Sequence, residues 1–355
     1  MKDPNNKKFR DPQLINKIVA DLQKWQQPIK IMEVCGSHTM AIGHWGIRKL
    51  LPPSISLISG PGCPVCVTPS SLIDELIKLK GVKIATFGDL IRVPGKEETL
   101  EQARARGLDV EIVYSPLEAL KLAEKKETVF VGIGFETTTP GIAQTILLAA
   151  NQKQKNFSVL PAFKLIPPAL DALLSEEDLS LDGFLLPGHV SVIIGSQSYN
   201  LLPHKYGIGG VVTGFEPLDI LRAVKILTEQ IEHGEATIVN EYNRVVNRDG
   251  NKVARHIIEE VLQVNDALWR GMGLIPKSGL TINEKYKEYD ASKKYEIMLK
   301  DEEAKTGCRC ADVLKGKIIP SDCPLFASKC TPANPIGSCM VSSEGSCAAY
   351  YKYER

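Results

Sequence analysis

Short apolar runs recur along the first two thirds of the chain, and they constrain the fold more than any other feature. Each run ends in glycine, proline or a small polar cluster, and helix-like patterns separate the runs. The strands that they predict are Ile29–Val34, Ser56–Ser59, Val82–Thr86, Val110–Val113, Thr128–Ile133, Phe157–Leu160, Gly183–Leu186 and Gly210–Val212. Strands that alternate with helices favour a parallel sheet with helices on both faces.

The segments between these runs predict helices from about Asp11 to Trp25, Pro69 to Lys80 and Ile142 to Asn151, because apolar residues recur there at spacings of three and four. The chain has 355 residues, enough for two or three domains. We therefore predict an α/β fold with two Rossmann-like domains in series. Residues 1–125 form a lead-in and the first domain, and residues 126–234 form the second. Motif loops follow the strands, at the edge where open parallel sheets bind ligands.

Charge and hydropathy exclude several functional classes. Lysine plus arginine (43) nearly equals aspartate plus glutamate (42), and no basic stripe indicates nucleic-acid binding. The N-terminus lacks the apolar core of a signal peptide. No apolar run reaches the roughly 18 residues that a membrane helix needs. We therefore expect a cytoplasmic protein that binds neither nucleic acid nor membrane.

Nine cysteines lie in two groups, with none between Cys66 and Cys308. In a reducing cytosol, closely spaced cysteines are more often metal ligands or redox groups than structural disulfides. The later group comprises Cys308, Cys310, Cys323, Cys330, Cys339 and Cys347. Zinc modules usually pair their ligands at short spacings, whereas this tail has wide, irregular spacings and no histidine. The pattern favours an iron–sulfur cluster over zinc, and zinc over structural thiols or disulfides.

Four cysteines suffice for a cubane cluster. We choose Cys308, Cys323, Cys330 and Cys347 as the ligands of a [4Fe–4S] cluster, although the residue pattern does not separate Cys347 from Cys339 or Cys310 as the fourth. Residues 235–355 then form a mainly helical cluster domain. In it, the polar run 283–305 is expected to be a solvated helical face or a linker.

Cys63-Pro-Val-Cys66 follows a predicted strand and the glycines of Gly60-Pro-Gly62. This spacing allows a disulfide across one helical turn, and a helix N-terminus lowers the pKa of a thiol. We expect a redox-active pair on a tight, exposed turn. Half of a zinc site, or two inert buried thiols, are the alternatives.

Cys35-Gly-Ser-His38 places a thiol and an imidazole at a strand end. Both groups are good ligands for iron and other late metals. A buried cysteine and a core histidine are common on their own, so this motif alone is a weak signal.

Three further motif loops carry acids and a histidine. Glu136 lies among threonine hydroxyls, His189 follows Pro187-Gly, and Glu216 and Asp219 follow a second Gly-Phe phrase. Two acids and a histidine at neighbouring strand ends form a cleft capable of proton transfer. Each residue taken alone is more simply explained by a structural role, such as capping a helix.

Taken together, these motifs closely resemble the HypD-type maturation proteins of nickel–iron hydrogenases. The motifs are Cys35-Gly-Ser-His-Thr39, Gly60-Pro-Gly-Cys-Pro-Val-Cys66, Gly134-Phe-Glu-Thr-Thr138, Pro187-Gly-His-Val190, Gly214-Phe-Glu-Pro-Leu-Asp-Ile-Leu221, Cys323-Pro-Leu-Phe and the series Cys330, Cys339 and Cys347. They run in order over essentially the whole chain.

The resemblance implies a scaffold that assembles an iron centre carrying cyanide and carbon monoxide. Cys35 would hold this transient iron jointly with a cysteine of a small HypC-type chaperone, and a HypE-type partner would deliver cyanide made from carbamoyl phosphate. Cys63 and Cys66 would be a redox pair linked to the [4Fe–4S] cluster. His38, Glu136 and His189 would position the iron or manage protons. On its own the chain is expected to be a monomer.

Two other functions remain open on the residues. A free-standing iron–sulfur thiol–disulfide oxidoreductase would use Cys63 and Cys66 and would not need Cys35. A zinc-stabilised binding protein would be colourless. On balance we expect an assembly scaffold with redox activity rather than a free-standing enzyme.

Overall fold

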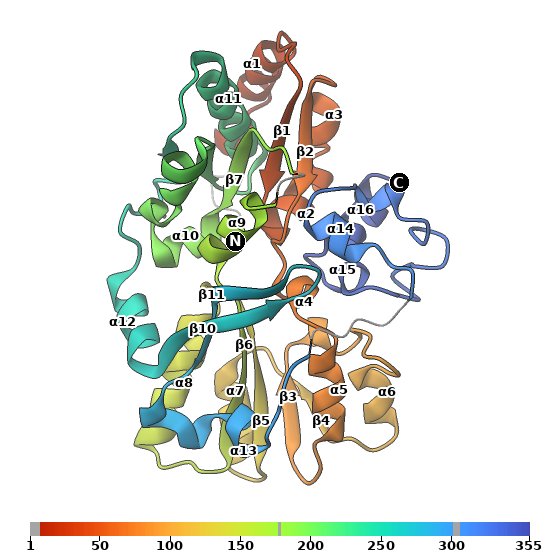
Figure 1. The fold of residues 1–355 in the computed structure, drawn as a ribbon, viewed down its shortest axis with the longest axis vertical. Coiled ribbons are helices and arrows are strands. Elements are labelled where there is room, and N and C mark those ends of the chain that lie inside the picture. Colours follow the sequence, from red (N-terminus) through yellow and green to blue (C-terminus); the bar gives the residue numbers. More distant parts are fainter. Residues whose placement is uncertain (1–7, 177–178, 301–305) are drawn as a thin grey trace.

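Two parallel sheets organise the protein, seen here in a computed structural model that describes residues 8–176, 179–300 and 306–355 (Figure 1). The first sheet has the order β2-β1-β7-β8-β9 and contains β1 (Ile29–Glu33), β2 (Ile55–Ser59), β7 (Gly183–Pro187), β8 (Gly209–Thr213) and β9 (Ile238–Asn240). The second has the order β4-β3-β5-β6 and contains β3 (Lys83–Thr86), β4 (Val110–Ile112), β5 (Thr128–Gly134) and β6 (Phe157–Phe163). We call the first sheet with its helices the upper lobe, and the second with its helices the lower lobe.

Helices cover both sheets. The upper lobe carries α1 (Pro12–Leu22), α2 (Gly36–His44), α3 (Ile47–Leu50), α10 (Gly188–Ile194), η3 (Ser196–Tyr199), η4 (Leu202–Tyr206) and α11 (Pro217–His233). The lower lobe carries α5 (Ser71–Lys78), η2 (Gly88–Leu90), α6 (Leu100–Ala105), α7 (Pro116–Ala123) and α8 (Thr139–Asn151), with α4 (Pro64–Val67) and α9 (Ile166–Leu174) at the junction. No helix among the described residues is long and apolar enough to cross a lipid bilayer.

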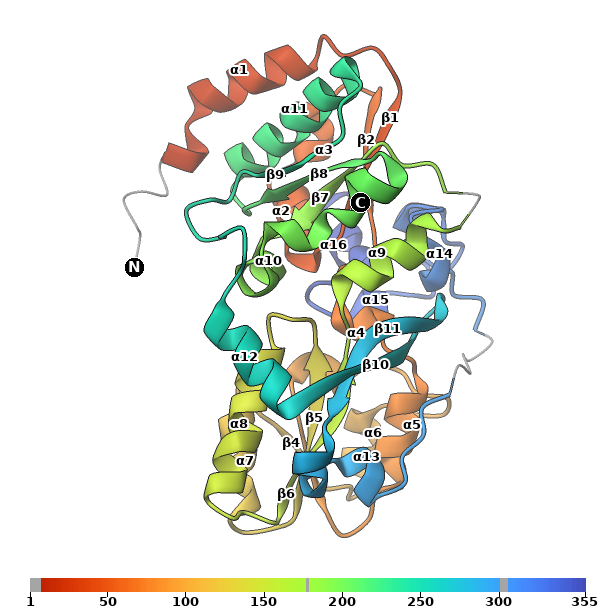
Figure 2. The ribbon, with the colours of Figure 1, turned by 60° about the vertical axis from the view of Figure 1, so that its left-hand side comes forward.

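Local sequence explains where several helices begin. Asp11 caps α1, because its carboxylate accepts from the backbone N–H of Gln13 at 2.8 Å, and Pro12 occupies the first helical position. α1 then packs along α11 on the outer face of the upper lobe (Figure 2). Every residue of β5 is buried, as expected for a central strand of a parallel sheet.

An antiparallel hairpin lies between the lobes. It consists of β10 (Leu262–Trp269) and β11 (Gly273–Ile282) and follows α12 (Lys252–Val261). The hairpin contacts β6 and α9, and Figure 2 shows it running across the waist of the molecule. The short helices η5 (Glu284–Tyr289) and α13 (Ala291–Lys294) then return the chain to the lower lobe.

Residues 306–355 form what we call the cysteine region. It is built from short helices, α14 (Cys310–Leu314), η6 (Pro320–Asp322), α15 (Ser338–Val341) and α16 (Ser346–Tyr353). α16 packs on α2, and α15 packs on α4. The region is therefore seated against the two N-terminal segments that carry cysteines.

The structure confirms the α/β class and the eight predicted strands, with small shifts at their ends. The prediction of two domains that follow one another along the chain is wrong. β1 and β2 pair with β7 rather than with β3, and β5 pairs with β3 across the expected boundary at residue 126. Periodicity in the sequence predicts strands but not which strands pair. It therefore could not predict that the chain leaves the upper lobe after β2 and returns to it at β7.

The expected mainly helical character of residues 235–355 is also wrong in part, because 262–282 form the hairpin. Of the polar run 283–305, η5 and α13 are helical as expected, and residues 301–305 lie outside the described residues.

Candidate functional site

Cys35 lies two residues after the end of β1 and immediately before the first turn of α2. Its side chain is 8% exposed, and burial raises the pKa of the thiol to about 12. The thiol is therefore protonated at neutral pH in the free chain. A metal ion that binds the sulfur must displace that proton.

Glu33 is a site residue that the sequence analysis missed. It is fully buried two positions before Cys35, and its carboxylate accepts from the Cys35 backbone N–H at 3.3 Å and from the Thr39 hydroxyl at 2.5 Å. Burial raises its pKa to about 7. The available signal was a lone acid inside the apolar run Ile29–Val34.

His38 lies in the first turns of α2, completely buried. Its Nε2 lies 3.0 Å from the carbonyl oxygen of Gly214 and 3.3 Å from that of Thr213. Two acceptors require that Nε2 carry the proton, so Nδ1 holds a free lone pair, and it has no hydrogen-bond partner among the described residues. Burial lowers the pKa of the imidazole to about 4. His38 is thus a neutral imidazole whose Nδ1 lone pair is available to a metal ion or to a hydrogen-bond donor.

His189 follows β7, the strand next to β1, and lies against the same aromatic ring as His38, that of Phe215. Its ring stacks on Phe215 at 4.2 Å between centroids, and His38 lies 4.8 Å from the same ring. His189 is exposed, and partial burial lowers its pKa. The structure therefore brings both predicted histidines to one edge of the upper sheet, next to the segment that carries Cys35.

The Cys63–Cys66 pair forms a disulfide, and the Cys66 backbone N–H lies 3.1 Å from the Cys63 sulfur. The turn before it packs directly on Cys35. The Gly36 backbone N–H donates to the Gly62 carbonyl at 2.8 Å, and a methyl group on Gly62 would overlap the Cys35 backbone. Only glycine permits this approach.

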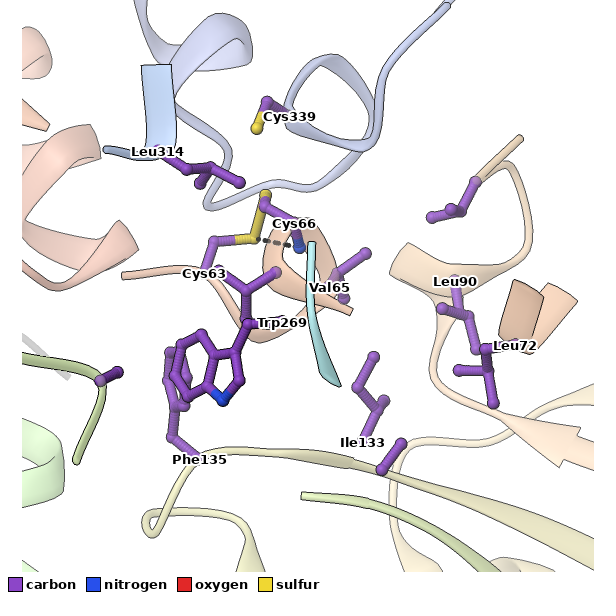
Figure 3. Packing of buried hydrophobic residues seen from close by; sticks show 14 of the residues in the cluster. Cys63, Val65, Cys66, Leu72, Leu90, Ile133, Phe135, Trp269, Leu314 and Cys339 are labelled. Carbon is purple, nitrogen blue, oxygen red and sulfur yellow. Dashed lines mark hydrogen bonds between the residues drawn. A yellow bond between two sulfur atoms is a disulfide. The ribbon is translucent and has the colours of Figure 1, made fainter. Parts of the chain in front are cut away.

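The prediction that this turn is exposed is wrong. Cys63 is 3% exposed and Cys66 is 0% exposed, because the two lobes and the cysteine region close around them. Figure 3 shows the disulfide between Trp269 on one side and Leu314 and Cys339 on the other. The disulfide is therefore an internal contact between these parts of the chain.

The six cysteines of the tail line a single small cavity of about 10 Å³. The Cys310 and Cys339 sulfurs lie 2.6 Å apart without a disulfide bond. Cys310 and Cys339, which the chosen ligand set omits, therefore lie beside the four chosen residues. The Ser338 hydroxyl donates to the Cys66 carbonyl at 3.3 Å, next to this cavity.

Within the described ranges, no three His, Cys, Asp or Glu side chains converge as ligands of one metal ion would. Thiolates around a cubane cluster need not converge, because each binds a different iron atom. A thiol-lined cavity with mostly buried cysteines and apolar neighbours such as Val313 and Phe326 is chemically suited to such a cluster.

Glu344 of the cysteine region also reaches this site, and the sequence analysis missed it. The Ser37 hydroxyl donates to its carboxylate at 2.6 Å, and a methyl group on Gly36 would overlap the Glu344 side chain. The charge of Glu344 adds to the rise that burial causes in the pKa of Cys35, and it partly offsets the fall that burial causes in the pKa of His189. Glu344 lies 307 positions from Ser37 in the sequence, so no local pattern connects it with the segment that carries Cys35.

Glu136 lies in the lower lobe, after β5, and is 4% exposed. One carboxylate oxygen accepts from the Ile166 backbone N–H at 3.0 Å, and the other is buried without a partner among the described residues. Burial raises its pKa to about 7. Glu136 lines a largely apolar pocket of about 300 Å³ with α9, α10, α12 and the hairpin.

The two acids of the Gly-Phe-Glu-Pro motif have structural partners. Glu216 pairs with Arg10 at 2.5 Å, and Asp219 pairs with Arg244 at 2.5 Å. Both acids lie at the start of α11. They therefore anchor neighbouring segments, and the cleft of two acids and a histidine is not assembled as expected.

A family model described as HypD, "Hydrogenase formation hypA family", matches residues 11–354. The chain is 44% identical to a putative hydrogenase expression/formation protein of Methanocaldococcus jannaschii, over 98% of the chain and 99% of that protein. It is 43% identical to hydrogenase maturation factor HypD of Rhodobacter capsulatus, over 97% of both chains. It is 41% identical to HypD of Escherichia coli K12, over 98% of the chain and 97% of that protein.

Proposed function

The chain belongs to the HypD family of hydrogenase maturation proteins, and we propose that it is the scaffold on which the iron centre with cyanide and carbon monoxide ligands is assembled. A role in hydrogenase maturation, beside other maturation proteins, follows from the family. The observation that carries the finer proposal is the packing of three thiol groups in series: Cys35, the Cys63–Cys66 pair and the cysteine-lined cavity.

In this proposal Cys35 binds the iron cargo. The S–H bond breaks, a sulfur–iron bond forms and one proton leaves. The Nδ1 lone pair of His38 is the group that positions the iron or its ligands, because it is buried and without a partner among the described residues. His189, exposed at the same edge, is the proposed acceptor of the thiol proton.

A [4Fe–4S] cluster is the proposed resident cofactor, held by Cys308, Cys323, Cys330 and Cys347, with Cys339 or Cys310 as the alternative fourth ligand. A cluster bound there would supply single electrons. The chemistry of the cavity lining supports this, since all six cysteines of the tail line it.

The Cys63–Cys66 pair is the proposed redox group between the cavity and Cys35. Opening the disulfide takes up two electrons and two protons and yields two thiols. Its burial keeps solvent oxidants away from the pair. Glu136 is proposed to exchange protons from the lower lobe, since its pKa of about 7 lets it gain and lose a proton near neutral pH.

The proposed partners follow from family membership alone. A small HypC-type chaperone would share the iron through its own cysteine, and a HypE-type protein would donate cyanide. We propose a cytoplasmic location for these encounters, with the chain monomeric before they occur.

The free-standing oxidoreductase loses support from the same geometry. A disulfide that is 3% and 0% exposed offers no access to a disulfide substrate, and the packing of Gly62 on Cys35 has no purpose in that mechanism.

The experiment that tests the proposal is complementation of a strain that lacks this gene. Cys35→Ala should abolish hydrogenase maturation and leave the visible spectrum of the purified protein unchanged. Lys49→Ala, at an exposed position on α3, is the control and should complement fully. Full hydrogenase activity with Cys35→Ala would refute the scaffold.

A further inference from the structure

The loop Ser342–Gly345 connects the two lobes at the site. It joins α15 to α16 and therefore lies between Cys339 and Cys347, which both line the thiol cavity. On one side Glu344 rests on Gly36 and accepts from the Ser37 hydroxyl at 2.6 Å. These are the two residues that follow Cys35, so the loop covers the segment that carries the thiol.

On the other side the loop is bound by Asp89, which lies in η2, shortly after β3 in the lower lobe. One carboxylate oxygen of Asp89 accepts from the Ser342 hydroxyl at 2.9 Å, from the Ser343 hydroxyl at 2.8 Å and from the Ser343 backbone N–H at 3.0 Å. Hydrogen bonds to an ionised acceptor are stronger than neutral ones. Asp89 therefore binds the loop through both of its serine side chains and through its backbone.

Cys35 and Asp89 share no hydrogen bond; the loop connects them, because Asp89 binds its serines and Glu344 binds Ser37. Asp89 belongs to a lobe that contributes no strand to the sheet of Cys35. Its side chain nevertheless binds Ser342 and Ser343, in the same loop as Glu344, whose charge acts on both Cys35 and His189.

We propose that Asp89 is a positioning residue that holds the Ser342–Gly345 loop against α2, so that access to the Cys35 thiol is controlled from the lower lobe. Cys35 is 8% exposed with the loop in place. Release of the loop would uncover it and remove Glu344 from its side. The proposal rests on the proposed role of Cys35 as the iron-binding thiol, but it makes a claim about the isolated chain.

The test is the rate at which iodoacetamide alkylates Cys35 in the anaerobic full-length protein, followed by mass spectrometry of the peptide that contains it. Asp89→Ala should raise this rate at least tenfold, which corresponds to about 1.4 kcal/mol in the opening of the loop. The matched control is Asp74→Ala, because Asp74 lies in the same lobe and accepts from the Lys96 backbone N–H at 2.7 Å. This control should leave the rate unchanged.

A second variant separates positioning from general loss of stability. Ser342→Ala with Ser343→Ala removes the two hydroxyl donors and should also raise the rate. Adding Asp89→Ala to that double variant should then have an effect smaller than its effect in the wild-type chain, since the interaction is already weakened. If Asp89→Ala also lowers the thermal midpoint, the alkylation rate of the double serine variant is the deciding result: an increase supports the proposal and no increase contradicts it.

An unchanged alkylation rate in Asp89→Ala, or equal increases in Asp89→Ala and Asp74→Ala with none in the serine variants, would overturn the proposal. The alkylation rate of Cys35 is measured on purified protein and does not depend on hydrogenase maturation. If complementation refutes the scaffold function, the alkylation result still stands, and a failed alkylation test leaves the scaffold function untouched.

Discussion

Replacing Lys164 by methionine is expected to stabilise the protein at neutral pH. Lys164 directly follows β6 and is 2% exposed. Its ammonium group makes no hydrogen bond or ion pair within the described residues, and burial lowers its pKa from 10.5 to about 8. A lysine that is held in a poorly solvated place without a counter-ion destabilises the fold whenever it is charged.

The magnitude follows from that pKa. A fall from 10.5 to about 8 corresponds to a loss of at most about 3 kcal/mol in the free energy of unfolding, felt in full below pH 8. As the pH rises the unfolded chain also loses its proton, and the loss shrinks to about 1 kcal/mol at pH 10. Methionine keeps an unbranched apolar side chain of similar length, so packing is largely retained.

The assay is thermal unfolding of wild-type and Lys164→Met protein at pH 7 and pH 10. At pH 7 the variant should gain several degrees, since a domain-sized unit shifts by about 2–4 °C per kcal/mol, and most of this gain should vanish at pH 10. Lys83→Met is the matched control, because Lys83 lies on β3 of the same sheet and pairs with Asp109 at 2.6 Å. It should lower the midpoint. No gain at pH 7, or an equal gain at both pH values, would refute the reasoning.

Two further predictions concern the predicted site residues. His38→Gln should flatten the pH dependence of the free energy of unfolding between pH 6.5 and 4, measured by urea unfolding. Burial lowers the pKa of the wild-type imidazole from 6.5 to about 4. The wild-type protein therefore has its full stability above pH 6.5 and loses up to about 3 kcal/mol as the pH falls through 4. Cys323→Ala should bleach the visible absorption of the anaerobic protein and loosen the cysteine region; an unchanged spectrum would remove Cys323 from the proposed ligands.

Strand existence was predictable here because buried parallel strands are continuous apolar runs. β5 is the clearest case, with all seven residues buried. The hairpin was missed because β10 exposes Gln263, Val264 and Asn265 in succession, so it shows neither the alternation of a half-buried strand nor an apolar run. β9 is three residues long and only partly buried.

The site was predictable as a set of residues but not as an arrangement. Cys35, His38 and His189 follow strands of one sheet, and the edge rule for parallel sheets brings them together. The role of Glu33 was hidden by its place inside an apolar strand. Glu344 reaches Cys35 only because the cysteine region folds back onto α2, and tertiary packing of this kind leaves no periodic signal in the sequence.

Lys164, Glu136 and His38 share a physical feature that links fold to function. Each is at least 96% buried, and burial disfavours the charged form of each. Such groups reduce stability or narrow the pH range of the fold, and they are expected where activity requires them. In the proposed scaffold, His38 and Glu136 are kept because the activity needs them. A gain in stability on replacing Lys164 would identify Lys164 as a third buried group that lowers stability.

The measurement that tests the scaffold most directly is the content of iron, acid-labile sulfide and zinc per chain in anaerobically purified protein, beside Cys35→Ala. The account predicts about four irons with matching sulfide in both proteins, and one further iron that is present only when Cys35 is intact and the maturation partners are co-expressed. Zinc without sulfide, or the same iron content in both proteins under co-expression, would contradict it.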